Sequence, residues 1–162
     1  MLRRIADWKL AVCLVGFLAL AACSKKTTPD LATGGQAQPG TVGDFQTNVG
    51  DRIYFLVDQS TLTPEGEETL RRQAAWLKQY PNVTVQIEGH ADERGTREYN
   101  IALSARRSTV TREFILSQGI DGARVTTIAY GKERPVALCD AESCWSQNRR
   151  AVTVITGGAS GG

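Results

Sequence analysis

The chain has 162 residues, of which 41% are hydrophobic and 22% charged, and this size and composition fit one compact domain with short appendages. Its formal net charge is only +2, and removal of a basic leader would bring the charge close to zero. This balance excludes the strongly basic surface that nucleic-acid binding requires.

The first 22 residues predict a cleavable secretion signal. Arg3, Arg4 and Lys9 lead into the apolar run 10–22, which is too short to span a bilayer as a permanent helix. The run ends in the letters LAAC at Cys23, which resemble the lipobox of bacterial lipoproteins. We therefore expect Cys23 to carry the acyl chains of a membrane anchor. The alternative is an ordinary signal in which Cys23 is incidental.

Residues 23–43 predict the lipidated cysteine and a flexible tether. The tether (SKKTTPDLATGGQAQPGTVG) is rich in Gly, Pro, Thr and Gln and has scarcely any large apolar residue. The glycine-rich end 157–162 predicts a frayed tail. The folded domain is therefore expected at residues 44–156.

The first half of this domain predicts a strand, a helix and a second strand. The β-branched and aromatic run 52–58 (RIYFLVD) and the alternating run 83–88 (VTVQIE) are both typical of strands. Between them, Thr63 can cap a helix that begins at Pro64 and stops at Tyr80, before the next proline.

The second half predicts a longer helix and two further strands. The helix is expected at residues 98–118, followed by a glycine, and the strands at 125–130 and 151–155. Residues 131–149 are polar and interrupted by Pro and Cys, so we expect a long surface loop there. The resulting order β-α-β-α-β-β predicts an α/β sandwich.

One arginine of the longer helix lies where a core residue is expected. Leu103, Arg107, Val110 and Phe114 recur at helical spacing on one face. A guanidinium on that face needs a partner, and Asp92 in the preceding glycine-rich loop (GHADERG) is a candidate. On residue types alone, a structural ion pair between Asp92 and Arg107 explains both residues.

Four blocks carry a resemblance to a known family: RIYFLVDQSTLTPEG, GHADERGTREYNIALSARR, YGKERPVA and QNRRAV. In this order they resemble the OmpA-like peptidoglycan-binding domain, over roughly residues 50–156. The lipobox and tether upstream are similar to those of the peptidoglycan-associated lipoproteins (Pal) in this family. The resemblance implies a mixed sheet packed against two main helices.

The resemblance also implies a binding site. In the family, Asp92 and Arg107 correspond to the residues that bind the free end of diaminopimelate in the peptide stem of peptidoglycan. The groove for the stem would be lined by four further residues, namely Asp58, Thr96, Asn100 and Leu103. For the Asp, Asn and Thr among these, loop and helix-cap structure is the alternative role. Val57 stands where the family more often has an aromatic residue, so an aromatic wall is missing.

The chemistry of these two residues suits a zwitterion. An arginine fork binds a carboxylate in bidentate fashion, and an aspartate accepts hydrogen bonds from an ammonium group. A stem that carries lysine lacks the second carboxylate and would leave Arg107 unmatched, at a cost of about 1–3 kcal/mol. Selectivity for diaminopimelate follows.

The same resemblance implies that the chain is a tether, anchored in the outer membrane by Cys23 and binding the cell wall from the periplasm. The family further implies membership of the Tol-Pal system of cell division, with TolB as a partner that competes with peptidoglycan. No cofactor or metal is expected. A flagellar stator protein and a porin are excluded as alternatives, since the first needs an uncleaved membrane helix and the second a barrel.

An enzyme is the competing class of function. His90 is the only histidine, and it could serve a hydrolase with Ser104, or hold a metal with carboxylates. The sequence shows neither a nucleophile motif in its expected setting nor a second histidine for a zinc site. We therefore expect no catalysis.

Cys139 and Cys144 predict a disulfide. They lie close together in the late loop, and the periplasm is an oxidising compartment. Closing so short a loop would contribute only about 2 kcal/mol, so we expect it to order residues 135–145 locally. A redox or metal role is the alternative.

Overall fold

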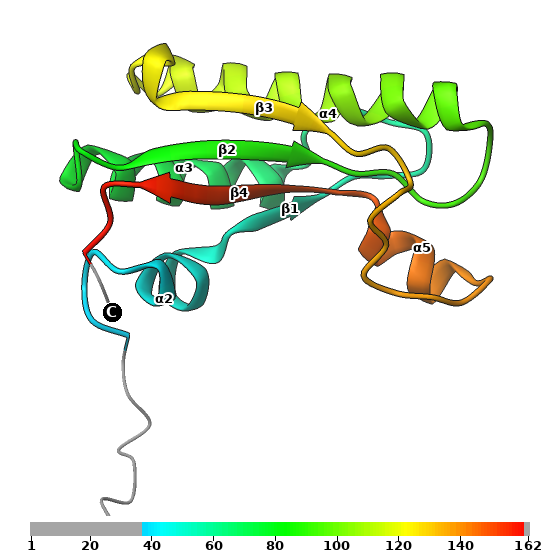
Figure 1. Cartoon of the computed structure of the whole chain (residues 1–162), viewed down its shortest axis with the longest axis horizontal. Helices are drawn as coiled ribbons and strands as arrows, with labels where there is room; N and C mark the ends of the chain where they lie inside the picture. Colours follow the sequence, from blue (N-terminus) through cyan, green and yellow to red (C-terminus); the bar gives the residue numbers. More distant parts are fainter. Residues whose placement is uncertain (1–36, 161–162) are drawn as a thin grey trace, which may run out of the picture. The chain divides into compact units, whose positions relative to one another are not determined.

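A four-stranded mixed sheet forms the framework of the domain. The computed structural model describes residues 37–160, and its strands are β1 (Arg52–Tyr54), β2 (Thr84–Gly89), β3 (Val125–Ala129) and β4 (Arg150–Gly157). Their order in the sheet is β1-β4-β2-β3 (Figure 1). β4 pairs antiparallel with both β1 and β2, whereas β2 and β3 are parallel.

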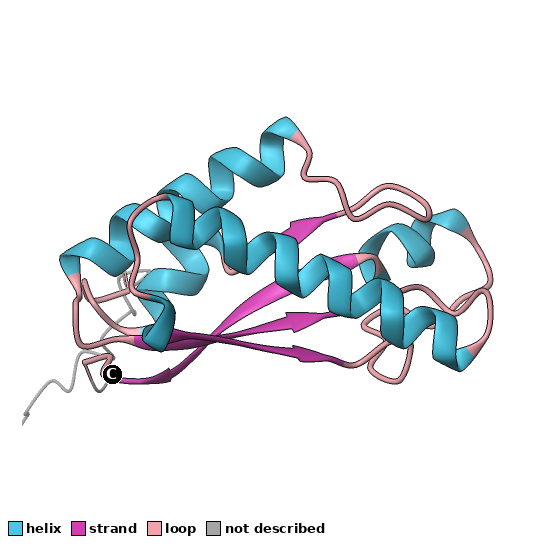
Figure 2. Ribbon diagram, turned by 90° about the horizontal axis from the view of Figure 1, so that it is seen from above, coloured by secondary structure: helices cyan, strands magenta, loops and turns pink. Residues whose placement is uncertain are grey.

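Two long helices cover one face of this sheet, as Figure 2 shows. They are α3 (Pro64–Gln79) and α4 (Arg97–Ser117). Shorter helical segments are α2 (Val42–Asp44), a π-helical turn (Phe45–Gly50), a 3₁₀ turn (Gly122–Arg124) and α5 (Glu142–Asn148). The predicted α/β sandwich with two main helices is confirmed.

The start of α3 follows from local chemistry. Thr63 accepts a hydrogen bond from the backbone N–H of Gly66 at 3.1 Å, and Pro64 occupies the first helical position. Leu70, Ala74 and Leu77 are buried on the face turned to the sheet. The predicted bounds of both long helices and of β2, β3 and β4 agree with the structure to within two residues.

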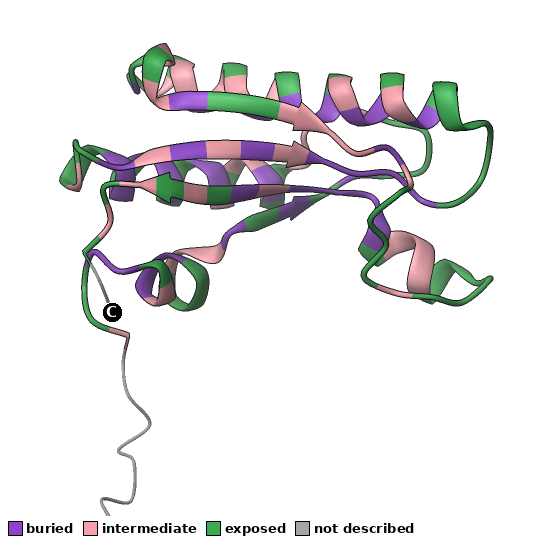
Figure 3. Cartoon of the chain, viewed as in Figure 1, coloured by how far each residue is buried: buried purple, intermediate pink, exposed green. Residues whose placement is uncertain are grey.

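The apolar core lies beneath α3. Trp76 packs against Phe45 and Tyr80, with ring centroids 4.9 Å and 4.5 Å apart. Strand residues such as Val85 and Ile87 complete the cluster. Figure 3 shows the buried residues of α4 on the side of the helix that faces the strands.

Two expected elements differ in the structure. The predicted strand 52–58 ends at Tyr54, because Leu56 and Val57 turn outward and Asp58 adopts a left-handed backbone with φ 59°. The predicted loop 131–149 contains α5. The side chain of Asn148 holds that segment by accepting from the N–H of Val136 and donating to the carbonyl of Ala137, both at 2.8 Å.

The folded unit is longer at both ends than the expected 44–156. Thr41 forms a parallel bridge with Ser160. Asp44 is tied in by hydrogen bonds from the N–H of Gly40 at 3.0 Å and from Trp76 Nε1 at 2.8 Å. The expected signal, lipidated Cys23 and most of the tether lie outside the described residues. Within residues 37–160, no helix has both the length and the apolar composition needed to cross a membrane.

Candidate functional site

A cavity of about 300 Å³ lies beside the carboxyl end of β2 and the first turns of α4. Its lining residues are Val57, Asp58, Asp92, Arg94, Gly95, Tyr99, Asn100 and Leu103. Four of the six residues predicted to bind the stem are among them. The other two, Thr96 and Arg107, do not line it. Three larger cavities lie elsewhere, but none of them is lined by a predicted binding residue.

Asp92 is one of two carboxylates in the lining of this cavity and is only 8% exposed. Its Oδ2 lies 2.6 Å from Arg94 Nη2 and 3.3 Å from Arg149 Nη1. Its Oδ1 accepts from Nε and from the backbone N–H of Arg94, both at 3.2 Å. Burial raises the pKa of Asp92, but these hydrogen bonds outweigh it and leave the pKa below its usual value. Asp92 is therefore ionised at neutral pH.

Arg107 is fully buried and donates to backbone carbonyls instead of to a carboxylate. Its Nε and Nη1 bind the carbonyls of Gln59 and His90 at 2.8 Å, and Nη2 binds that of Leu56 at 3.3 Å. Burial lowers the pKa of Arg107 to about 10, so it keeps its charge at neutral pH. The ion pair with Asp92 that residue types alone favoured is not formed, because other arginines occupy that carboxylate.

A turn at residues 56–59 separates Arg107 from solvent. Its Asp58 accepts a hydrogen bond from the hydroxyl of Tyr99 on α4, and Val57 is half exposed at the cavity rim. Arg107 and Tyr99 thus both hold this turn, Arg107 through backbone carbonyls and Tyr99 through the Asp58 side chain. The turn forms one wall of the cavity.

Two of the predicted binding residues have structural partners. Thr96 caps α4 by accepting from the N–H of Tyr99 at 3.2 Å. Asn100 is buried and donates to the carbonyl of Arg94 at 2.7 Å. The cap role fits the alternative given above for Thr96, and Asn100 both fixes the loop and lines the cavity.

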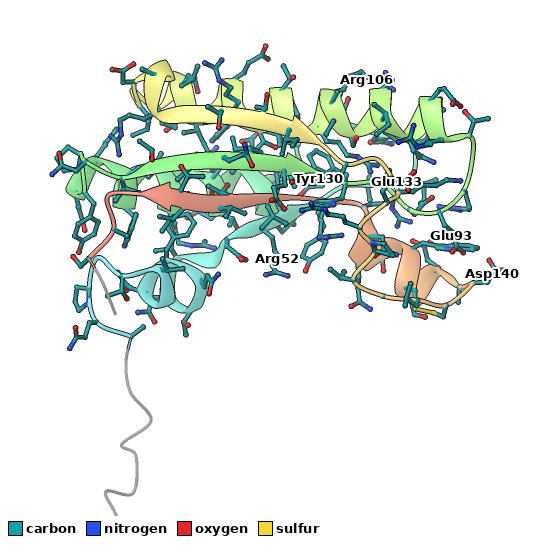
Figure 4. The ribbon with its side chains drawn as sticks, in the orientation of Figure 1. Arg52, Glu93, Arg106, Tyr130, Glu133 and Asp140 are labelled. Atoms are coloured by element: carbon teal, nitrogen blue, oxygen red, sulfur yellow. A yellow bond between two sulfur atoms is a disulfide. The ribbon has the colours of Figure 1, made fainter. Side chains whose placement is uncertain are left out.

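The sequence reasoning missed Arg94, Tyr99 and Trp145. The guanidinium of Arg94 lies over the ring of Trp145, with Cζ 4.2 Å from the centroid. Trp145 Nε1 donates to Glu93 Oε1 at 2.9 Å, so α5 is docked on the loop after β2. Figure 4 shows Glu93 at the same end of the molecule as the segment that carries Asp140. The one signal in the sequence that could have pointed to Arg94 is its position two residues after Asp92.

His90 and Ser104 do not form a catalytic pair. Ser104 Oγ is bonded to the carbonyl of Ile101 and to the N–H of Gly131, both at 2.9 Å. Neither ring nitrogen of His90 has a hydrogen-bond partner among the described residues. Burial, with help from Arg150 and Arg134, lowers the pKa of His90 to about 3, so its 3.5 Å approach to Glu88 is not an ion pair at neutral pH.

The described residues contain no group of three side chains that could hold a metal ion. Cys139 and Cys144 form the predicted disulfide, with their Cα atoms 5.6 Å apart. This bond closes the turn that leads into α5. Arg149, at the end of the same helix, contacts both Glu142 and Asp92, so the disulfide lies in the segment that supports the cavity.

Comparison with known proteins identifies the family. The model of the OmpA family matches residues 54–150. A peptidoglycan-associated lipoprotein of Rhizobium meliloti is 54% identical over 98% of this chain and 94% of its own length. One of Brucella melitensis is 53% identical over 96% of each chain.

Solved structures agree with this result. The crystal structure of the peptidoglycan-associated lipoprotein from Burkholderia pseudomallei has a TM-score of 0.64 and 37% identity, and the match covers 65% of this chain and 90% of that one. The C-terminal domain of Helicobacter pylori MotB, at 17% identity and a TM-score of 0.62 over 66% and 84% of the two chains, shares the fold. The chain belongs to the peptidoglycan-associated lipoproteins and carries the OmpA-family domain.

Proposed function

We propose that this protein is a lipoprotein that binds peptidoglycan non-covalently through diaminopimelate and so links the outer membrane to the cell wall. Family membership supports peptidoglycan as the ligand, and the leader with Cys23 supports a lipid anchor in the outer membrane with the domain in the periplasm. The observation that carries the proposal is that an ionised, largely buried Asp92, bound by Arg94 and Arg149, lines a cavity at the start of α4.

In this proposal, Asp92 accepts hydrogen bonds from the ammonium group at the free end of diaminopimelate. Arg107 supplies positive charge behind the cavity. A guanidinium has five N–H groups, and the described residues accept from three of its nitrogens. An outward shift of the turn 56–59 would let a remaining N–H of each terminal nitrogen reach the ligand's carboxylate.

Asp58, Asn100 and Leu103 line the path of the stem next to this end, and Thr96 holds the start of α4 in place. A lysine-type stem offers the ammonium without the neighbouring carboxylate. It would leave the cationic side of the site unpaired, which costs about 1–3 kcal/mol. We therefore expect a preference for diaminopimelate-type walls.

Membership of the family further supports a place in the Tol-Pal system, with TolB as a partner and a role in cell division. An enzyme of wall metabolism is disfavoured, because the relatives are named for association with peptidoglycan and for a lipid anchor. The bonding of Ser104 to Gly131 also leaves His90 without a nucleophile partner. Incubation with purified sacculi should release no soluble fragments.

The proposal can be tested by co-sedimentation of the full-length protein, in detergent, with sacculi of the diaminopimelate type. We expect Asp92→Ala to reduce binding at least tenfold. Arg107→Lys should also weaken binding, since a lysine keeps the charge but loses the planar fork. Arg106→Ala is the matched control, because Arg106 precedes Arg107 on α4 and points away from the sheet (Figure 4).

Circular dichroism establishes that each variant is folded before its binding is measured. If folded Asp92→Ala sediments with sacculi as well as the wild type does, the cavity is not the wall-binding site. If lysine-type sacculi bind equally well, the ligand is not the diaminopimelate end. Equal loss in Arg106→Ala would mean that bulk charge dominates.

A further inference from the structure

Residues 40–50, which we call the latch, connect the start of the described chain to the sheet. They include α2 and the π-helical turn, and none of these residues lies in one of the four strands. Apart from the bridge between Thr41 and Ser160, the latch makes its main contacts with α3. Any tension on the tether therefore passes through the latch before it reaches a strand.

Asp44 is the central residue of the latch and is largely buried. Its Oδ2 accepts from the backbone N–H of Gly40 at 3.0 Å and from Trp76 Nε1 at 2.8 Å, and its Oδ1 accepts from Asn48 Nδ2 at 2.8 Å. These hydrogen bonds, led by the one from Trp76, hold the pKa of Asp44 below its usual value. One ionised carboxylate thus joins the start of the latch to α3.

The contacts between the latch and α3 follow one another along both segments. At the start of the latch, Gly40 lies so close to Tyr80 that a Cβ on Gly40 would be 2.7 Å from the ring atom Cε1. The middle of the latch contacts Trp76, one helical turn earlier. At the end of the latch, the carbonyl of Gly50 accepts from Gln73 Nε2 at 2.7 Å. A pull on the tether therefore loads these contacts one at a time, beginning at Tyr80.

Strand β1, which follows the latch, is held in a different way. It pairs antiparallel with β4 over all of its length, Arg52–Tyr54. The start of the described chain and the start of α4, where the cavity lies, are at opposite ends of the sheet (Figure 1). Tension between these two points runs along the strands, and the hydrogen bonds between β1 and β4 lie across it and share it. The latch is therefore the weaker of the two attachments.

We infer that the latch is a tension-sensitive extension of the tether, which opens at a force that leaves the sheet and the cavity intact. This inference rests on the proposed function only in that a link between membrane and wall carries tension. Once released from α3, residues 40–50 add at most about 40 Å of extended chain. None of these residues lines the cavity. The domain can thus keep its ligand while the membrane moves away from the wall.

The latch closes again when the tension falls. Phe45 is buried in the closed latch, with its ring centroid 4.9 Å from that of Trp76. Opening exposes the Phe45 ring to water, so the hydrophobic effect favours closure. The hydrogen bonds of Asp44 then fix the position of the closed segment. The extension is therefore reversible.

The inference is tested by single-molecule force spectroscopy on the full-length protein. One handle is fused to the N-terminus, and the other is attached to an azide-bearing residue in place of Arg97, which is exposed at the start of α4. We expect a first length increase of at most about 40 Å, at a force below that of global unfolding. This first step should reverse when the force is relaxed.

Two glycines of the latch provide matched variants. Gly40 has a left-handed backbone with φ 82°, and a methyl group there would press on Tyr80. Gly40→Ala should therefore lower the force of the first step at least twofold. A methyl group on Gly43 would lie 3.4 Å from the side chain of Ala37, an ordinary contact, so Gly43→Ala should open at the wild-type force. Global unfolding should need the same force in all three proteins.

Hydrogen exchange of the Trp76 indole N–H gives a second readout, without applied force. In the closed latch this group is buried and donates to Asp44. We expect it to exchange at least tenfold faster in Gly40→Ala than in the wild type or in Gly43→Ala. If the latch is already open in Gly40→Ala at zero force, the first step will be missing and the exchange fast, which also supports the inference.

Three outcomes would overturn the inference. The first is unfolding of the wild type in a single step. The second is a first step that needs the same force in Gly40→Ala as in the wild type, because the step would then arise outside the latch. The third is a lower force of global unfolding in Gly40→Ala, which would make the latch part of the core. No wall ligand takes part in this experiment, so its failure and a failure to bind sacculi are separate results.

Discussion

The two long helices lie on the same face of the sheet (Figure 2) but are held there by different forces. The buried face of α3 is mainly apolar, with Leu70, Trp76 and Leu77 in the core. The buried face of α4 is mainly polar, and it consists of Asn100, Leu103, Ser104, Arg107, Ser108, Thr111 and Ile115. Hydrophobic burial is non-directional, whereas hydrogen bonds fix angles and distances. We infer that α3 mainly stabilises the fold, whereas α4 mainly fixes the positions of the segments it contacts.

The hydrogen bonds of α4 reach the segments around the cavity. Ser104 holds the N–H of Gly131, Arg107 holds the carbonyls of Leu56 and His90, and Asn100 holds that of Arg94. The helix also approaches β2 very closely, since a Cβ on Gly89 would lie 1.9 Å from the carbonyl oxygen of Ser104. The buried polar face of α4 therefore fixes the positions of several loops relative to one another.

The largest expected effect tests the stabilising role of α3. Leu77→Ala removes a fully buried side chain from the core and should lower the free energy of unfolding by about 3–5 kcal/mol, through lost burial and the cavity that remains. Urea denaturation measures this change. Binding of the folded variant to sacculi at low temperature should match that of the wild type. A tenfold loss of binding would show that the apolar core at α3 and the cavity beside α4 are coupled.

How far the fold could be predicted depends on whether its signals are local. Thr63 and Pro64 mark the start of α3 by capping chemistry, and the strands show their own periodicity, so these elements are found in sequence alone. The exposed Leu56 and Val57 look like strand residues, and only tertiary contacts turn them outward. α5 has seven residues and depends on contacts made elsewhere, so its own sequence is a weak signal.

The site divides in the same way. Asp92 could be predicted because its glycine-rich loop follows a strand and carries a family motif. The partners of Arg107 could not be found, because they are backbone carbonyls of three residues, two of which lie about fifty positions away in sequence. Carbonyl groups belong to every residue and leave no trace in the residue types. The sequence also could not show that Asp92 binds Arg94 and Arg149 in place of the expected Arg107, because these contacts depend on the folded arrangement.

The second prediction concerns how the stability of the domain changes with pH because of His90, which directly follows β2. His90 is buried beside Tyr130, Arg150 and Arg134 with a pKa of about 3, whereas an unfolded histidine has a pKa of about 6.5. Below pH 6.5 the unfolded chain therefore binds a proton that the folded protein rejects. Stability is fully present above pH 6.5 and is lost as the pH falls, by about 2 kcal/mol between pH 6.5 and 5.

His90→Phe should remove this contribution and keep the stacking on Tyr130. Urea denaturation of both proteins at pH 7, 6 and 5 gives the difference in slope. Leu77→Ala is the control, because Leu77 lies in the apolar core. This variant should be less stable at every pH but should show the same dependence of stability on pH as the wild type. Parallel stability curves for the wild type and His90→Phe would mean that the folded protein takes up this proton as readily as the unfolded chain does, so that the pKa of His90 is not lowered by folding.

The smallest expected effect concerns the disulfide under the cavity. Replacing Cys139 and Cys144 by serine should lower the free energy of unfolding by at most about 2 kcal/mol, because the closed loop is short. The consequence for the site should be specific, since α5 carries the Trp145 on which Arg94 rests. We expect the doubly substituted protein to stay folded and to bind diaminopimelate-type sacculi a few-fold more weakly. Reduction of the wild type should reproduce both the loss of stability and the weaker binding, whereas unchanged binding would show that the hydrogen bond to Glu93 alone keeps Trp145 in position.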